Sequence, residues 1–350
     1  YQELNRRANQ LAHYLINKGV SSNDLVGVCE ERSFELIIGI LGILKSGAAY
    51  VPIDPEYPQD RISYIVKDTS AKVILCDGKS RRLLMDSSTG ADLLNLENQY
   101  VEIENESGTN PSLPIQNTNL IYSIYTSGST GIPKGSLVQH KGLTNLVNWY
   151  VKEFEFSENS HFLLSSSINF DLTQKNVFAP IISGGRLCIS SFAYNDFDQL
   201  IDVVEKFEIT NINCTPSVFY GFVDHREEEE MKKLSSLEYV VLGGEPISFS
   251  NLQEWYTNPF NKAKVVNSYG PTECSDVVSY FIIDYDEDKD MRSIPIGKPI
   301  YNTELYILDS DHMQLPMGVQ GELFIGGECV GSGYLNRPDL TASKFVPNPF

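Results

Sequence analysis

Short apolar segments with strand character alternate with helical segments along most of this chain, and this alternation constrains the fold more than any other feature. The chain opens with a predicted helix that has Leu4, Ala8, Leu11 and Leu15 on one face. This helix is predicted to end at Gly19. Strands are predicted at 25–29, 72–76, 120–125, 161–165, 186–189, 210–214, 237–242 and 264–267, and helices at 34–44, 59–67, 141–152 and 197–207. Such alternation predicts an α/β fold with mainly parallel sheets covered by helices.

The pattern changes in two places. Residues 77–119 are polar and are predicted to be irregular. After about residue 277, strands at 277–283, 304–308 and 321–325 follow one another without helices, which predicts a smaller antiparallel sheet or barrel. We therefore expect two packed α/β subdomains in residues 1–283 and a β-rich subdomain in residues 284–350.

Charge and composition exclude several classes of protein. The formal net charge of -19 argues against a nucleic-acid partner, because a phosphate backbone would be repelled. The chain has neither a long apolar run nor a basic leader, so we expect no membrane partner. The six cysteines are scattered without a C-x-x-C pair, which favours reduced thiols and a cytoplasmic location. The acidic run 227–230 is predicted to be an exposed loop or a helix start.

The strongest chemical signal is the segment Tyr125–Gly135, YTSGSTGIPKG, which follows a predicted strand. Its glycines let backbone N–H groups converge on phosphate oxygens, and its hydroxyls and Lys134 add donors and a positive charge. The alternative is a flexible turn without a ligand. The spacing differs from G-x-x-x-x-G-K-[ST], which argues against a P-loop kinase or ATPase.

The segment LIYSIYTSGSTGIPKG at 120–135 resembles the phosphate-loop signature of the adenylate-forming enzymes. Four further segments are similar to signatures of the adenylation domains of nonribosomal peptide synthetases: LKSGAAYVPID at 44–54, NSYGPTE at 267–273, GELFIGGECVGSGYL at 321–335 and NRPDLTASKFVPNPF at 336–350. The resemblance covers the whole chain. It implies the fold of that superfamily, with two mainly parallel sheets flanked by helices and a smaller β-barrel-like subdomain.

The resemblance also implies an ATP site. The phosphates would be held by Thr126, Ser127, Gly128, Ser129, Thr130, Gly131 and Lys134, and the nucleoside and α-phosphate by Gly243, Gly244, Glu245, Asn267, Ser268, Tyr269, Gly270 and Thr272. The implied catalytic residues are Thr272, Glu273, His140 and Lys134, with Glu273 as the ligand of Mg2+. The alternatives are a surface role for Glu273, a structural role for His140 and a simple strand-ending turn at Gly243 and Gly244.

A second implied site holds an amino acid. Asp171, in Phe170-Asp171-Leu172-Thr173, would pair with the α-ammonium group, although an isolated aspartate more often caps a helix. The implied lining consists of Leu172, Lys175, Asn213, Val241, Gly243, Ser268, Asp276 and Val277. Lys175 could pair with Asp276, face an acidic or amide substrate, or lie on a helix surface. We expect a small or medium polar side chain on the substrate.

The implied reaction converts ATP and an amino acid to aminoacyl-AMP and pyrophosphate, for loading onto a carrier-protein thiol. The implied partners are peptidyl carrier and condensation domains, the carrier bearing phosphopantetheine. The family's ribose-binding aspartate would follow Phe350, and its small C-terminal catalytic-lysine subdomain is absent, so we expect this fragment to turn over poorly. Alternatives are an acyl- or aryl-CoA ligase and a non-catalytic nucleotide-binding module. The departures from the family pattern are Thr173, Ser136 and the run Gly331-Ser332-Gly333.

Overall fold

The computed structural model describes residues 1–87, 90–127, 131–289 and 291–350. Its contacts divide the chain into two compact units. The first comprises 1–143, 167–169 and 331–347, and the second comprises 144–166, 170–330 and 348–350. The boundary predicted near residue 283 stays a prediction.

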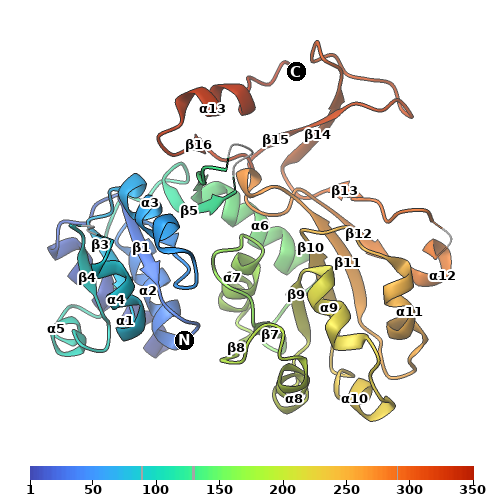
Figure 1. Ribbon diagram of the computed structural model, residues 1–350, viewed down its shortest axis with the longest axis horizontal. Helices are drawn as coiled ribbons and strands as arrows, with labels where there is room; N and C mark the ends of the chain where they lie inside the picture. Colours follow the sequence, from blue (N-terminus) through green and yellow to red (C-terminus); the bar gives the residue numbers. More distant parts are fainter. Residues whose placement is uncertain (88–89, 128–130, 290) are drawn as a thin grey trace. The chain divides into compact units, whose positions relative to one another are not determined.

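The first unit is built on a seven-stranded sheet with the order β16-β6-β5-β2-β1-β3-β4 (Figure 1). The strands are β1 (Leu25–Cys29), β2 (Ala49–Pro52), β3 (Val73–Cys76), β4 (Asp92–Leu94), β5 (Leu120–Thr126), β6 (Lys134–Gln139) and β16 (Gly333–Tyr334). The pairs from β5 to β4 are parallel, whereas β6 is antiparallel to both β5 and β16. Strand β6 was missed, because its sequence KGSLVQ reads as the end of the glycine-rich loop.

Helices cover both faces of this sheet. They are α1 (Gln2–Asn17), α2 (Phe34–Lys45), α3 (Gln59–Thr69) and α4 (Gly78–Met85). Helix α5 (Tyr100–Glu104) packs against α1, and α13 (Pro338–Lys344) packs against the edge strand β16. Ile62, Ile65 and Leu84 from α3 and α4 are buried against Ile74 and Val51 of the strands. Helix α2 is apolar nearly all round, and it is buried between the sheet and α1 on the other face.

The prediction of an irregular stretch over residues 77–119 was wrong, because this stretch contains α4, β4 and α5. Asp77 starts α4, since its carboxylate accepts hydrogen bonds from the backbone N–H groups of Lys79 and Ser80 at 2.9 and 2.7 Å. These elements are short and mostly exposed, so they lack the apolar periodicity by which helices and strands are recognised.

The second unit has its own seven-stranded sheet, with the order β13-β12-β11-β10-β9-β7-β8. Its strands are β7 (His161–Leu164), β8 (Arg186–Ile189), β9 (Asn211–Cys214), β10 (Tyr239–Gly243), β11 (Lys264–Tyr269), β12 (Ser279–Ile283) and β13 (Lys298–Pro299). The five from β8 to β11 are parallel, and β12 and β13 continue the sheet in antiparallel fashion. The prediction of two mainly parallel sheets is confirmed.

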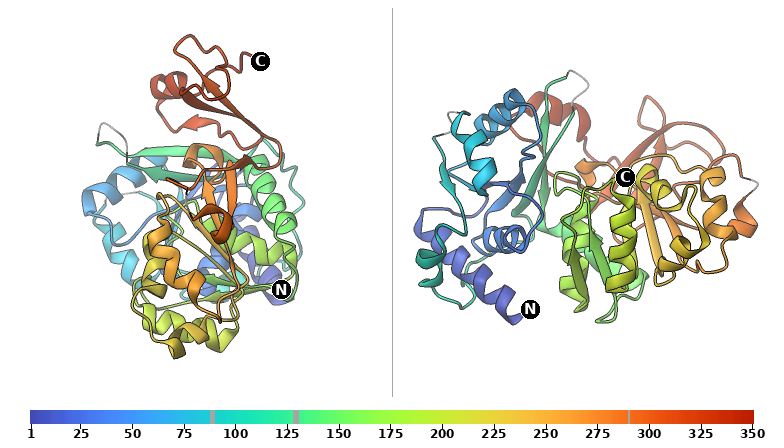
Figure 2. Two further views of the ribbon diagram at one scale, coloured as in Figure 1. Left: turned by 90° about the vertical axis from the view of Figure 1, so that its right-hand side faces the viewer. Right: turned by 60° about the horizontal axis from the view of Figure 1, so that its bottom comes forward.

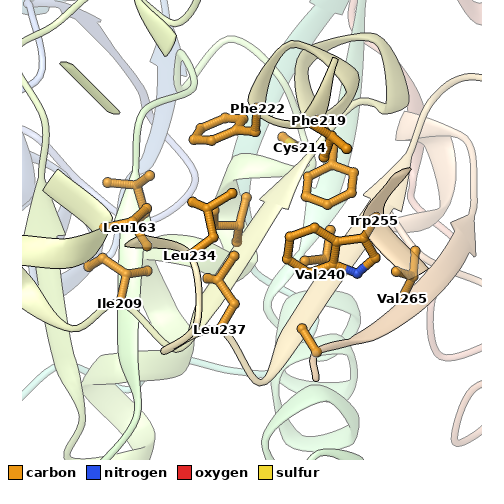
Figure 3. Close-up of a cluster of buried hydrophobic side chains, with 14 of the residues drawn as sticks. Leu163, Ile209, Cys214, Phe219, Phe222, Leu234, Leu237, Val240, Trp255 and Val265 are labelled. Carbon is orange, nitrogen blue, oxygen red and sulfur yellow. The ribbon is translucent and has the colours of Figure 1, made fainter. Parts of the chain in front are cut away.

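One face of the second sheet carries a large apolar core and is covered by α8 (Phe197–Phe207), α9 (Pro216–Val223), α10 (Glu228–Lys233) and α11 (Phe249–Thr257). The rings of Trp255 and Phe219 meet edge to face at 5.1 Å in the middle of this core (Figure 3). Alternate strand residues, such as Ile212, Val240 and Leu242, point into it. Residues 227–230 begin α10 with a capping box, which confirms the predicted helix start.

The remaining elements of the second unit are α6 (His140–Glu153, which starts in the first unit), α7 (Thr173–Ser183), the 3-10 turn η1 (Thr272–Cys274) and α12 (Tyr285–Asp288). The predicted β-rich segment contains the antiparallel hairpin β14 (Thr303–Leu308) and β15 (Glu322–Gly327), coloured orange-red in Figures 1 and 2. All six cysteines are buried, and no disulfide joins them in the described part of the chain. No described helix is long and apolar enough to cross a membrane.

Candidate active site

The predicted phosphate loop is the connection of an antiparallel hairpin. Thr126 ends β5 and is paired in register with Lys134, which begins β6. Gly131 has φ +80°, in the left-handed region that glycine favours, and Ser127 is exposed. The other predicted loop residues, Gly128, Ser129 and Thr130, lie outside the described residues. The hairpin therefore fixes the two ends of the loop at one edge of the first sheet.

The ammonium group of Lys134 is held by Tyr334. Lys134 Nζ donates a hydrogen bond to the Tyr334 hydroxyl at 2.9 Å and lies 4.4 Å from the centre of its ring. Tyr334 is in position because β16 pairs with β6, which places it beside Ser136. No role was predicted for Tyr334, although it lies inside the segment GELFIGGECVGSGYL that carried part of the resemblance.

His140 is the first residue of α6, and its backbone N–H donates to the carbonyl of Asn119 at 2.9 Å. Its ring is partly buried, and burial lowers the pKa of the imidazole. Nε2 is buried and has no hydrogen-bond partner among the described residues. The side chain is therefore a neutral imidazole with a ring nitrogen left to bond a ligand.

In the second unit, the nucleotide-binding candidates gather at the carboxyl ends of two adjacent parallel strands. Gly243 is the last residue of β10 and is followed by Gly244, and Tyr269 is the last residue of β11 and is followed by Gly270. Ligands of open α/β sheets bind outside this edge. Tyr269 is 39% exposed, so its aromatic side chain is accessible to a planar ligand.

Three other candidates near this edge have structural bonds of their own. Asn267 Nδ2 donates to the carbonyl of Pro295 at 2.8 Å, and the Ser268 hydroxyl donates to the carbonyl of Leu242 at 3.0 Å. The Glu245 carboxylate accepts hydrogen bonds from the N–H and hydroxyl of Ser217 at 3.1 and 3.0 Å. Glu245 therefore holds the first turn of α9 in this structure.

The predicted amino-acid lining lies on the face of the second sheet opposite the Trp255 core. Asn213, Val241, Gly243 and Ser268 share this face, because Asn213 pairs in register with Val241, and Gly243 with Ser268. We call the whole buried set the polar cluster: Leu172, Lys175, Asn213, Val241, Gly243, Ser268, Asp276 and Val277. A Cβ at Gly243 would approach the Ser268 Oγ to 2.8 Å, so glycine keeps this side of the cluster open.

Asp171 lies just before α7 and beside Thr272 of η1. Its carboxylate accepts the N–H of Leu172 at 2.8 Å, while α7 has no side-chain cap, so the capping alternative is not observed. Burial raises the pKa of Asp171, and a hydrogen bond to Thr272 and the charge of Lys175 oppose this rise. The nearby charge of Glu273 raises it further. An approaching cation would stabilise the ionised form.

Lys175 and Asp276 form an ion pair inside the polar cluster. Lys175 is fully buried at 0% exposure, which overturns the alternative of a lysine on the helix surface. Burial raises the pKa of the Asp276 carboxyl, and the adjacent Lys175 lowers it. Since one buried charge compensates the other, the pair is neutral as a unit.

The backbone after η1 is shaped for this arrangement. Ser275 and Asp276 have φ values of 58° and 78°, which are unusual for residues with side chains. A Cβ at Gly270 would lie 1.8 Å from the carbonyl oxygen of Asp276, so only glycine permits the two segments to touch. The motif NSYGPTE thereby brings Asp276 close behind Thr272.

Comparison with known proteins agrees with this geometry. Residues 1–335 match the profile of the AMP-binding enzymes. The chain belongs to the AMP-binding enzyme family. The resemblance to adenylation domains of nonribosomal peptide synthetases is thereby confirmed, because its relatives within this family are peptide synthetases.

Two of these relatives illustrate the extent of the match. The AMP-binding chain is 39% identical over 352 residues to tyrocidine synthase 1 of Brevibacillus parabrevis, covering 100% of the chain and 31% of that protein. It is 40% identical over 351 residues to gramicidin S synthase 2 of Aneurinibacillus migulanus, covering 100% of the chain and 8% of that protein. The chain thus spans less than a third of the length of these relatives.

Solved structures of AMP-binding enzymes resemble the whole chain. The peptide synthetase FmoA3 in its alpha-methyl-L-serine-AMP bound form has a TM-score of 0.90 at 29% identity, covering 100% of this chain and 39% of that one. The N-terminal subdomain of Klebsiella oxytoca NpsA, in complex with 3-hydroxybenzoyl-AMSN, has a TM-score of 0.86 at 26% identity, covering 100% and 86%.

Thr126, Lys134 and His140 belong to the first unit, whereas Asp171, Thr272, Glu273 and the polar cluster belong to the second. Glu273 is a partly exposed carboxylate on η1, and no group of three or more metal-binding side chains occurs among the described residues. A single carboxylate suits Mg2+, which usually takes one or two carboxylates with phosphate oxygens and water. The individual site assignments stay predictions.

Proposed function

We propose that this chain activates an amino acid by joining its carboxylate to the α-phosphate of ATP, with release of pyrophosphate. The observation that carries the proposal is Asp171, a partly buried carboxylate next to Thr272 and Glu273 and near Lys175, whose own charge is balanced by Asp276. An α-ammonium group is the partner that such a carboxylate lacks. The alpha-methyl-L-serine-AMP bound by FmoA3 supports this reading, since it is an aminoacyl adenylate.

The residues of the chain would serve the reaction chiefly by positioning and by neutralising charge. Thr126 and Lys134, with the loop between them, would hold the β- and γ-phosphates of the leaving group. The hydroxyl of Thr272 would donate to the α-phosphate as the amino-acid carboxylate attacks it. Tyr269 would stack on adenine. Mg2+ held by Glu273 would offset the charge of the phosphates.

The neutral imidazole of His140 would bond the substrate carboxylate without adding charge. Asp171 would hold the ammonium end, so the carboxylate is presented in one orientation only. The remaining partners proposed for the chain are a peptidyl carrier domain, whose phosphopantetheine thiol takes the aminoacyl group, and a condensation domain. With six buried cysteines and no disulfide in the described part, we also propose that the protein works in the reducing cytoplasm.

The exchange of labelled pyrophosphate into ATP tests the proposal on the full-length protein. We expect exchange that requires Mg2+ and one or a few amino acids, and that is not supported by octanoate or benzoate. A rate with octanoate or benzoate above that with every amino acid would favour an acyl- or aryl-CoA ligase. No exchange with any acid, together with no heat on titration with ATP and Mg2+, would favour a non-catalytic module.

A further inference from the structure

The charge balance of the polar cluster bears on which amino acid it accepts, given the proposed function. Lys175 is fully buried, Asp276 is 6% exposed, and the two are ion-paired. Tyr150 on α6 is also buried close to Asp276, and burial and that charge raise the pKa of its hydroxyl, so it is neutral. The lysine charge is thus cancelled by Asp276, and Asp171 is left to balance the α-ammonium group.

A charged substrate side chain would upset this balance. A carboxylate would place a second negative charge beside the buried pair, and an ammonium group would place a second positive charge beside Lys175. An uncompensated buried charge is strongly unfavourable. The pair therefore discriminates against acidic and basic side chains alike, although Lys175 by itself would attract an acid.

The cluster keeps unused hydrogen-bond acceptors on Asn213 and Ser268. Asn213 Nδ2 donates to the carbonyl of Leu172 at 2.6 Å, whereas its Oδ1 is buried without a partner among the residues that the structure describes. The Ser268 hydroxyl donates its hydrogen bond to the carbonyl of Leu242 at 3.0 Å, so its lone pairs remain available to accept one. Both residues lie on the same sheet face, so a ligand there meets acceptors.

We infer that the polar cluster selects an amino acid whose side chain is uncharged and carries a hydrogen-bond donor, a hydroxyl or a carboxamide. The ion pair of Lys175 and Asp276 has no net charge and therefore disfavours charged side chains. The Oδ1 atom of Asn213 accepts a hydrogen bond from the donor group of the substrate. Removing one charge of the pair leaves the other uncompensated, so the site then favours a substrate side chain with the same sign of charge as the group that was removed.

Pyrophosphate exchange on the full-length protein tests this with serine, threonine, asparagine and glutamine against aspartate, glutamate, lysine, ornithine, alanine and valine. We expect the best hydroxyl or carboxamide substrate to exceed every charged amino acid by about 100-fold or more in kcat/KM. A charged or aliphatic amino acid as the best substrate would overturn the inference while leaving the proposed function intact. Exchange with no amino acid would contradict the proposed function itself.

Charge-removing variants provide the sharper test. Asp276→Asn leaves Lys175 unbalanced, so the preference for aspartate or glutamate over the best neutral substrate is expected to rise about tenfold or more. Lys175→Met is expected to raise the corresponding ratio for lysine or ornithine, and the double variant is expected to restore the preference for neutral substrates. Equal losses for all substrates would contradict the inference.

Two further variants keep the test decisive if the buried substitutions impair folding. Asn213→Leu is expected to lower kcat/KM for the best donor substrate relative to alanine by about tenfold, and an unchanged ratio would count against the acceptor role. The matched control is the surface pair Lys233–Asp202, joined at 2.6 Å. Lys233→Met with Asp202→Asn is expected to change no substrate ratio.

Discussion

At the scale of single residues, backbone contact explains the candidate site better than side-chain chemistry alone. Gly270 touches the carbonyl of Asp276, and that contact sets the path of the segment holding Thr272 and Glu273. The sequence suggested a role for Gly270 only through the resemblance. The reason for glycine is steric, and it becomes visible only when two segments that are separated by a turn are seen together.

Gly270→Ala is therefore expected to destabilise the protein by about 3 kcal/mol, because the backbone must move away from a Cβ that would lie 1.8 Å from a carbonyl oxygen. Thermal unfolding of the full-length protein measures this. The matched control is Gly78→Ala, where nothing lies within 4 Å of the added Cβ and the change is expected to stay within about 1 kcal/mol. Equal melting temperatures for Gly270→Ala and the wild type would contradict the steric account.

Glu30 makes stability depend on pH. Burial raises its pKa to about 8, and the nearby carboxylates of Asp77, Glu35 and Glu97 add to the rise. An unfolded glutamate ionises near 4.5, whereas folded Glu30 keeps its proton until about 8. Between these values the unfolded state binds fewer protons, so this residue lowers the free energy of unfolding as pH rises.

Glu30→Gln has no carboxyl group to ionise, so the fall in the free energy of unfolding with rising pH disappears. Relative to the wild type, the variant is expected to gain on the order of 1–3 kcal/mol between pH 5 and pH 8.5. Melting curves recorded at both pH values check the difference. Parallel pH dependences in the two proteins would show that Glu30 is ionised in the folded state.

At the scale of elements, the helices of the second unit are held by the apolar face of its sheet. Alternation along β9, β10 and β11 sends Ile212, Val240 and Val265 into the Trp255 core, and sends Asn213, Val241 and Ser268 to the polar cluster. One face of these strands thus forms the apolar core that stabilises the unit, and the other face carries residues of the candidate site.

Trp255→Ala is expected to cost about 3–5 kcal/mol, since the side chain is 1% exposed and packs against Phe219. Loss of the indole leaves a cavity that the surrounding helices fill only in part. Met317→Ala, at a fully exposed position, is the matched control and is expected to leave the melting temperature unchanged. A loss below about 1 kcal/mol at Trp255 would place the centre of the core elsewhere.

The short strand β16 positions Lys134, the lysine of the predicted phosphate loop, through Tyr334. Tyr334→Phe removes the hydroxyl that accepts from Lys134 and keeps the ring below the ammonium group. We expect the KM for ATP to rise about fivefold with little change in the KM for the amino acid. Tyr306→Phe, which removes a surface hydroxyl bonded to Glu304, is the control. A rise in both KM values would indicate a general structural defect instead.

At the scale of the whole molecule, the sequence predicted the regular part of the fold and most of the candidate residues. Strand β1 and helix α8 have the predicted bounds, because each has a clear apolar period. The sequence did not reveal β6 or Tyr334, since a strand of glycine, serine and lysine has no such period. It also left the state of Lys175 open, because pairing with a residue 101 positions away depends on the folded chain.

We propose that Asp171 receives the ammonium group of an amino acid joined to AMP. Calorimetric titration of the full-length protein with a nonhydrolysable aminoacyl sulfamoyl adenosine, and with its analogue lacking the amino group, tests this most directly. The account predicts that the amino compound binds at least about 30-fold more tightly, and that Asp171→Asn removes the difference. Equal affinities in the wild type, or an unchanged preference in Asp171→Asn, would contradict it.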